Sequence, residues 1–213
     1  KRPIPPHNMT MTITGAAMLW VGWFGFNGGS ALSAGGDAAM AILATHISAA
    51  AGAMTWMFYE WVKFGKPTAL GGTITPASGF VGPAGALVIG IIAGYVCFNA
   101  VIIIKQKFKI DDSLDVFPVH GVGGICGTIL VGFFASKELG IFSGQGGWSH
   151  EAIIISDQLQ IQFTAVVATA AYTAISTFII LKLVDLVTGL RVDSQTETQG
   201  LDLESHGEKG YDI

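Results

Sequence analysis

Long apolar stretches alternate with short polar segments along most of the chain. A helix needs about 20 apolar residues to cross a hydrocarbon layer about 30 Å thick. The stretches that reach this length are residues 9–31, 38–62, 84–104, 116–135 and 161–184. This pattern predicts a membrane-spanning helix at each of them. We therefore expect an all-α, multi-spanning helical membrane protein.

Residues at the ends of these stretches indicate where the helices begin. Asp37 precedes the second stretch and Asp115 the fourth, and a carboxylate in this position can accept a hydrogen bond from an N–H group of the first turn. Pro83 precedes the third stretch, and proline suits the first turn because the N–H group it lacks has no helical partner there. We predict that Asp37 and Asp115 cap their helices.

Residues 68–82 form a further apolar stretch that is too short for a regular span. As a helix it would rise only about 22 Å, and its glycines and proline are poor helix formers. The positive-inside rule nevertheless favours a crossing. With a crossing, ten of the eleven Lys and Arg residues lie on one side, whereas without it the lysines of 105–109 lie opposite Lys63 and Lys66. We predict a sixth, short or broken span, with its freed backbone groups covered by protein or facing a water-filled cavity.

The composition agrees with this class of protein. Of 213 residues, 51% are hydrophobic and 12% are charged, against roughly 25% charged in a soluble domain. Fifteen acidic and eleven basic residues give a net charge of −4, which provides no basic surface for nucleic acid. The composition therefore disfavours a soluble globular domain, a disordered chain and a nucleic-acid-binding protein.

Two regions of the chain differ in polarity. Residues 1–190 contain the apolar stretches, and residues 191–213 form a polar, acidic tail. The predicted crossings place this tail on the side rich in Lys and Arg, so we expect it in the cytoplasm. Residues 1–8 are polar and rich in proline, without the apolar core of a signal peptide. We expect the sequence to come from the interior of a longer protein.

The sequence contains no pattern typical of a catalytic centre. Cys97 and Cys126 lie in apolar runs, and their spacing matches neither a zinc site nor a CxxC pair, so we interpret both as reduced packing residues. No nucleophile–base set, phosphate-binding loop or metal-ligand spacing is apparent. We expect a protein that is not an enzyme and that uses no cofactor or metal.

Two histidines lie inside predicted spans. An ionisable side chain at membrane depth is costly and needs a partner or a cavity, and a neutral imidazole can also carry a proton near neutral pH. For His120, the residue type leaves a functional role and a satisfied buried role equally open. For His46 we favour packing with one hydrogen bond.

Aromatic residues are dense near the end of the first stretch, where Trp20, Trp23, Phe24 and Phe26 are followed by Ser30. An aromatic belt at the membrane interface would explain them, and the spacing alone favours this interpretation. The alternative is a cation site. Aromatic faces attract a small cation within about 6 Å, and the Ser30 hydroxyl can accept a hydrogen bond from an N–H donor.

Several long motifs together resemble the ammonium transporter (Amt/Mep/Rh) family, and its Amt branch in particular. They occur in the family's order and cover nearly the whole chain. The matching segments are GWFGFNGGSALSA (Gly22 to Ala34), EWVKFGKPTALG (Glu60 to Gly71), TPASGFVGP (Thr75 to Pro83), DVFPVHGVGGICG (Asp115 to Gly127) and GLDLESHGE (Gly200 to Glu208). The resemblance implies an eleven-helix fold with two inverted halves, of which this chain would be the second, comprising the sixth to eleventh helices.

The resemblance also implies roles for individual residues. By matching positions, Phe26 is similar to the family's pore-gating phenylalanine and Ser30 to the serine of its external ammonium site. His120 is similar to the second of the family's two pore histidines. Trp23 is a neighbour in the same motif and receives no separate role. The first pore histidine and the other gate phenylalanine belong to helices that this chain does not contain.

The function implied by the resemblance is transport of ammonium or ammonia through a hydrophobic pore in the plasma membrane. Ammonium would lose a proton on entry, and histidine would assist its conduction as ammonia. The family assembles as a homotrimer, and a PII-type regulatory protein is expected to dock at the cytoplasmic face. Two alternatives remain: an ammonium sensor that signals through the tail, and an Rh-type gas channel.

Overall fold

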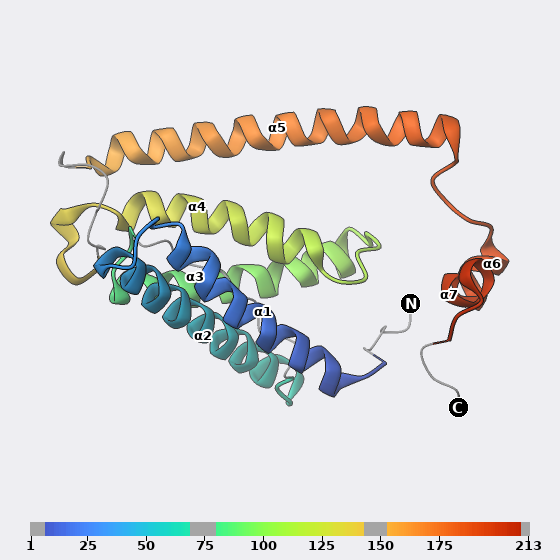
Figure 1. Ribbon diagram of the computed structural model, residues 1–213, viewed down its shortest axis with the longest axis horizontal. Helices are drawn as coiled ribbons and strands as arrows, with labels where there is room; N and C mark the ends of the chain where they lie inside the picture. Colours follow the sequence, from blue (N-terminus) through green and yellow to red (C-terminus); the bar gives the residue numbers. More distant parts are fainter. Residues whose placement is uncertain (1–6, 69–79, 143–152, 210–213) are drawn as a thin grey trace. The chain divides into compact units, whose positions relative to one another are not determined.

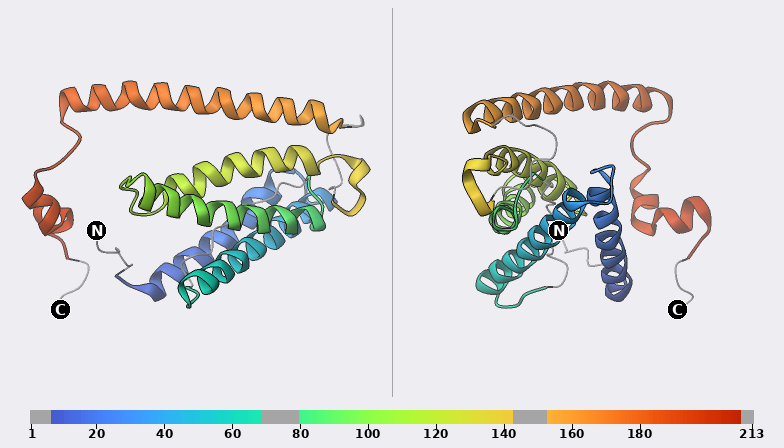
Figure 2. Two further views of the ribbon diagram at one scale, coloured as in Figure 1. Left: turned by 180° about the vertical axis from the view of Figure 1, so that it is seen from behind. Right: turned by 60° about the vertical axis from the view of Figure 1, so that its left-hand side comes forward.

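The computed structural model describes residues 7–68, 80–142 and 153–209. Contacts within the chain divide it into two compact units, Lys1–Val166 and Val167–Ile213. Within the first unit α1 packs on α2, α2 on α3 and α3 on α4, as Figures 1 and 2 show. The long helices are α1 (Met9–Gly29), α2 (Gly36–Phe64), α3 (Pro83–Ile102), α4 (Val122–Phe134) and α5 (Ile155–Val187).

Shorter helical segments extend or connect these helices. One π-helical segment continues α3 and another leads into α4, a 3-10 helix follows α4, and two short helices lie in the tail. They are Ile103–Lys107, Phe117–Gly121, Lys137–Phe142, α6 (Ser194–Gln199) and α7 (Leu201–His206).

Five of the described helices are long and apolar enough to cross a membrane. They are Met9–Gly29, Gly36–Phe64, Pro83–Lys107, Phe117–Phe134 and Ile155–Val187, with the π-helical segments included in the third and fourth. The prediction of an all-α, multi-spanning helical membrane protein is confirmed. Residues 69–79 of the short or broken span predicted at 68–82 lie outside the described residues.

Two helices are longer than the apolar stretches that predicted them. α2 begins at Gly36 and ends at Phe64, and α5 runs from Ile155 to Val187. The extra residues of α5 include Asp157 in its first turn, where a carboxylate interacts favourably with the unpaired N–H groups. A helix can therefore extend beyond the apolar part of its sequence.

The cap predicted for α2 is wrong. The capping position is Gly35, which makes no side-chain cap, and Asp37 lies inside the first turn. The helix begins at Gly36, one residue before Asp37, so the extended residue that precedes it is Gly35. At its other end Gly65 adopts φ +76° and its N–H bonds the carbonyl of Trp61 at 2.9 Å, and glycine is favoured in this left-handed conformation.

Small residues allow α3 to approach α2 closely. A Cβ atom added at Gly94 would lie 2.7 Å from the carbonyl oxygen of Gly52, and one added at Gly90 would overlap the carbonyl of Ser48. Ser48 and Gly52 are themselves buried. The GxxxG spacing of Gly90 and Gly94 therefore forms a helix contact, as small residues commonly do in membranes.

Two apolar clusters form the core of the first unit. Ala44, Ile89 and Phe134 belong to one, and Cys97 and Trp56 belong to the other. Cys97 and Cys126 are both free thiols. Cys97 therefore has the packing role that we predicted for it.

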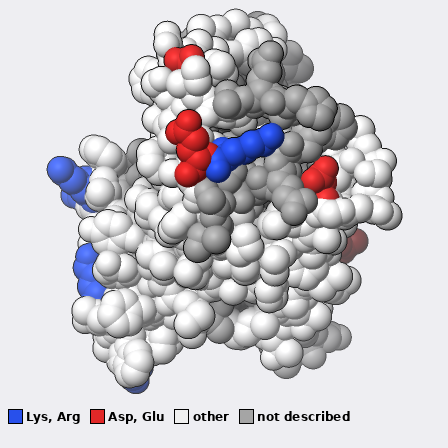
Figure 3. Space-filling view, turned by 90° about the vertical axis from the view of Figure 1, so that its left-hand side faces the viewer, with Lys and Arg blue, Asp and Glu red and all other residues white. Residues whose placement is uncertain are grey.

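The surface is poor in charge. Figure 3 shows one face on which charged side chains are few and most of the area is uncharged. On α1, Met18 and Leu19 are 71% and 72% exposed. Large exposed apolar side chains of this kind suit contact with lipid or with further protein.

Candidate functional site

The C-terminal end of α1 carries Trp23, Phe26 and Ser30. Trp23 is half-buried, whereas Phe26 is 75% exposed and Ser30 is exposed. Ser30 is the C-cap of the helix, and its hydroxyl donates a hydrogen bond to the carbonyl of Phe26 at 2.9 Å. Because the hydroxyl proton is used in this bond, the oxygen lone pairs remain as acceptors for an outside donor.

A partly buried hydrogen bond joins this end of α1 to α2. The side-chain amide of Asn27 donates to the hydroxyl of Thr45 at 2.8 Å, and Thr45 donates in turn to the carbonyl of Ala41 at 2.6 Å. A Cβ atom at Gly28 would lie 2.9 Å from a side-chain carbon of Ile42. These contacts hold the backbone between Phe26 and Ser30.

His120 lies on the π-helical turn Phe117–Gly121 that leads into α4. Pro118 is buried, and Val119 packs against the cluster of Trp56, Cys97 and Phe98, with its carbonyl 3.8 Å from the sulfur of Cys97. His120, the next residue, is exposed. Among the described residues it has no hydrogen-bond partner. The turn therefore packs through Pro118 and Val119 and leaves the imidazole on its outer face.

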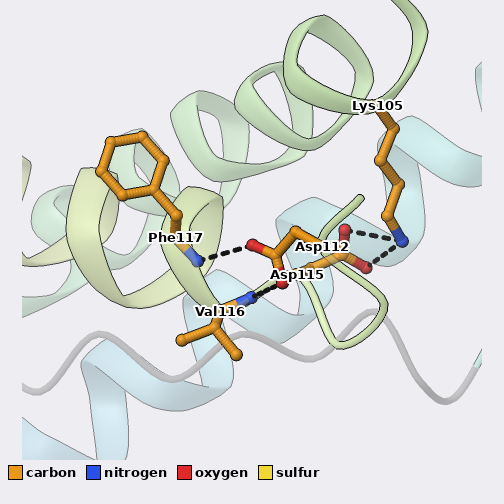
Figure 4. A network of polar contacts seen from close by, with 5 residues as sticks. All are labelled: Lys105, Asp112, Asp115, Val116 and Phe117. Carbon is orange, nitrogen blue, oxygen red and sulfur yellow. Dashed lines mark hydrogen bonds and ion pairs between the residues drawn. The ribbon is translucent and has the colours of Figure 1, made fainter. Parts of the chain in front are cut away.

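Acidic side chains organise the start of this turn, as Figure 4 shows. The carboxylate of Asp112 accepts hydrogen bonds from the N–H groups of Val116 at 2.9 Å and Phe117 at 2.8 Å. Asp115 instead forms an ion pair with Lys105, with N···O distances of 2.8 and 2.9 Å. The prediction that Asp115 caps this helix is wrong, because Asp112 takes the first free N–H groups.

The residues predicted at the site lie on two different helix pairs. Phe26 and Ser30 belong to α1, which packs on α2, and His120 leads into α4, which packs on α3. The described residues do not bring His120 into contact with Phe26 or Ser30. The geometry therefore contains two separate candidate positions.

His46 differs from its expected environment. It is exposed, and its ring lies on α2 beside two aromatic rings of α1, with centroids 5.7 Å from Trp20 and 5.6 Å from Phe24. It borders an apolar hollow of about 400 Å³ that Phe24, Ile42 and Leu43 also line. His46 therefore packs against aromatic rings as expected, but it is exposed, and the hydrogen bond expected for its imidazole is not found among the described residues.

The tail in the second unit has its own polar organisation. Asp193 caps α6 by accepting hydrogen bonds from the N–H of Thr196 at 2.9 Å, its hydroxyl at 2.9 Å and the N–H of Gln195 at 2.9 Å. The bonds from Thr196 lower the pKa of the Asp193 carboxyl most. Arg191 pairs with Glu197 at 2.7 Å.

Comparisons with known proteins agree with the motifs. The model of the family described as "Ammonium Transporter Family" matches residues 1–211. The chain belongs to the Ammonium Transporter Family. Its members are transport proteins rather than enzymes, which confirms the expectation that this protein is not an enzyme.

Individual members of the Ammonium Transporter Family match along nearly all of the chain. It is 43% identical to the ammonium transporter of Bacillus subtilis, over 97% of this chain and 52% of the relative. It is 44% identical to ammonium transporter Amt1 of Archaeoglobus fulgidus, over 98% of this chain and 54% of the relative. The chain thus spans about half the length of these members.

Solved structures of the same type share the fold. A structure named "Sensor Amt Protein" matches with a TM-score of 0.80 and 29% identity, covering 94% of this chain and 50% of that one. The crystal structure of Saccharomyces cerevisiae Mep2 matches with a TM-score of 0.75 and 34% identity, covering 91% and 46%. This chain is therefore an Amt/Mep-like part of a multi-pass membrane protein.

Proposed function

We propose that this chain supplies half of a pore that conducts ammonium as ammonia. The observation that carries the proposal is His120, an exposed imidazole without a partner among the described residues, on an apolar helix of a protein in this family. An ionisable side chain facing lipid is unfavourable. The remaining half of the transporter therefore packs against this face, and His120 lies at a narrow lumen between the two halves.

The entrance of the pore is assigned to the end of α1. The exposed ring of Phe26 attracts a small cation and gates the lumen below it. The oxygen of Ser30, whose own proton is bonded to the carbonyl of Phe26, accepts an N–H of ammonium. Trp23, half-buried beside them, adds aromatic surface. This arrangement favours a cation that can also donate hydrogen bonds.

Conduction past the entrance requires the loss of charge. A charge at mid-membrane costs several kcal/mol, whereas neutral ammonia that hydrogen-bonds to His120 is held at much lower cost. Ammonium breaks one N–H bond and enters as ammonia, and its proton moves separately along the pore histidines. Potassium has no proton to release and stays charged, so it is excluded.

The decisive experiment compares two exposed histidines in the full-length protein. His120→Ala should lower ammonium transport about five- to 150-fold, since losing a hydrogen-bond partner in a dry site costs about 1–3 kcal/mol. His46→Ala is the matched control and should transport at close to the wild-type rate. Transport and potassium exclusion that are both unchanged in His120→Ala would remove this residue from the mechanism.

A second candidate function is ammonium sensing. It is favoured by the similarity to the structure named "Sensor Amt Protein" and by the separate unit that contains the tail. A chain truncated after Val192 discriminates the two functions. A transporter keeps ammonium uptake without the tail, whereas a sensor loses its output while ammonium binding persists.

The assembly and surroundings of the protein follow from the same proposal. The homotrimer has one pore per subunit and lies in the plasma membrane, with the tail in the cytoplasm. A PII-type regulatory protein binds at that face. Cross-linking of the membrane protein tests the trimer, and protease accessibility of the tail in sealed vesicles of known orientation tests its side.

A further inference from the structure

We infer that Lys105, Asp112 and Asp115 are positioning residues that hold the turn bearing His120 in its π-helical form. This inference rests on the proposed function of His120. Figure 4 shows the three side chains in the connection between α3 and α4, where Lys105 reaches Asp115 and Asp112 binds the N–H groups of Val116 and Phe117. None of them contacts the imidazole, so their effect passes through the backbone of the turn.

The first step concerns the backbone that enters the turn. Asp115 adopts φ +56°, a left-handed conformation that is unfavourable for a residue with a side chain, although Asp tolerates it better than most. Its carbonyl accepts a hydrogen bond from the N–H of Val119 at 3.0 Å. The strained Asp115 is therefore hydrogen-bonded to the turn that carries His120. Its left-handed conformation persists only if surrounding contacts restrain it.

Lys105 supplies that restraint from the neighbouring segment. It lies in the π-helical segment Ile103–Lys107 and reaches both carboxylate oxygens of Asp115. The ion pair joins positions 10 residues apart in the chain, across the connection between α3 and α4. Lys105 is exposed, with 38% relative exposure of its side chain, whereas Asp115 is partly buried at 28%, so the pair is less screened by water than one in which both partners are fully exposed.

Asp112 restrains the same turn from its other side. Its two oxygens bind the N–H groups of Val116 and Phe117 separately. The carbonyl of Phe117 then accepts the N–H of Val122, which closes the π-helical ring around His120. A register in which Phe117 lost its bond to Asp112 would no longer begin this ring at the same residue. Asp112 thus determines the residue at which the π-helical ring starts. The ion pair of Lys105 with Asp115 determines how the backbone enters the turn.

Loss of these restraints should slow conduction without changing ammonium binding at the entrance. If the turn relaxes, the imidazole moves relative to the lumen while the entrance on α1 stays intact. A small misplacement of a conducting group can reduce a rate on the order of ten- to a hundredfold. We expect the maximal rate of ammonium transport to fall in Lys105→Gln and Asp115→Asn, with the ammonium concentration at half-maximal rate unchanged.

The test uses the full-length protein in lipid nanodiscs and proteoliposomes. Lys107→Gln is the matched control, because Lys107 is an exposed lysine of the same π-helical segment and has no ion pair among the described residues. The variant Lys105→Arg keeps the positive charge and leaves the left-handed Asp115 in place, so it tests whether the ion pair itself matters. Hydrogen exchange of the amides at 116–122 reports the turn independently of transport.

The inference is supported if Lys105→Gln and Asp115→Asn speed exchange at 116–122 and lower the maximal rate. Lys107→Gln should behave like wild type, and Lys105→Arg should keep most of the wild-type rate. It is overturned if exchange at 116–122 does not change, or if exchange rises while the rate stays at the wild-type value. A lower rate in His120→Ala together with wild-type behaviour of the Lys105 and Asp115 variants overturns only the inference. Wild-type transport by His120→Ala rejects the proposed function itself.

Discussion

The hydroxyl of Ser30 donates its proton to the carbonyl of Phe26, one turn earlier on α1, at 2.9 Å. This bond uses the hydroxyl proton, so only the oxygen of Ser30 remains free to interact with a ligand. The oxygen can accept, but its proton is already used, so the group suits a ligand that donates hydrogen bonds. The same bond joins the residue proposed to bind ammonium to the backbone of the residue proposed to gate it.

Removing this acceptor should weaken ammonium binding. In Ser30→Ala we expect the ammonium concentration at half-maximal transport to rise at least about tenfold, because a hydrogen bond to a charged group contributes about 1.5–3 kcal/mol. Concentration-dependent uptake measures this change. Ser33→Ala, an exposed serine just beyond the helix, is the control, and an equal change in both variants would argue against a specific role for Ser30.

The contact between α2 and α3 should tolerate no side chain at Gly94. We expect Gly94→Val to reduce the free energy of unfolding by about 1–3 kcal/mol or more, because the added atoms meet the backbone of Gly52. Thermal unfolding in detergent measures the effect. Gly124→Ala adds a side chain where no atom lies within 4 Å and should leave the unfolding temperature close to wild type.

The bond between Asn27 and Thr45 should behave as one interaction. Thr45→Val leaves the amide of Asn27 without this acceptor in a partly buried position, and we expect a loss of about 1–3 kcal/mol. Asn27→Ala should be similar. The double variant should lose less than the sum of the two single losses, and strict additivity would show that the contact contributes nothing to stability.

The tail should lose the cap of α6 in acid. Hydrogen bonds from Thr196 lower the pKa of Asp193, so the folded cap favours the carboxylate. Its contribution is present above the ordinary Asp pKa of about 3.9 and disappears as pH falls through the lowered pKa of the folded form. NMR titration of the Gln195 and Thr196 amides measures this. Asp193→Asn keeps an acceptor and should remove the pH dependence without unfolding α6.

The length of apolar stretches was sufficient to predict the membrane helices, because a bilayer demands a minimum run of apolar residues. The length of these stretches did not predict which residues cap the helices. Asp115 stands next to the predicted helix and looked like its cap, yet Asp112 reaches the free N–H groups because Asp115 takes a left-handed conformation and turns toward Lys105. Such an arrangement depends on α3, which a local sequence pattern does not contain.

The candidate site could also be predicted only in part from the sequence. The motifs indicated Phe26, Ser30 and His120 through a family resemblance, but the residues alone left each with a structural alternative. The exposure of His46 could not be predicted, because it depends on how far Trp20 and Phe24 of α1 extend over α2. Whether a side chain in a helix bundle is buried depends on how a neighbouring helix packs against it. The sequence of one helix does not contain that information.

The π-helical turn at Phe117–Gly121 also limits how this sequence can change in length. Successive residues of an α-helix are about 100° apart around its axis. A deletion of one residue within the turn would rotate α4 by that amount about its axis. The buried Gly123 and Gly127 would then turn away from the neighbouring helices. Natural variants should therefore gain or lose residues in the connection before Asp112, while the spacing from Asp112 to Gly127 stays constant.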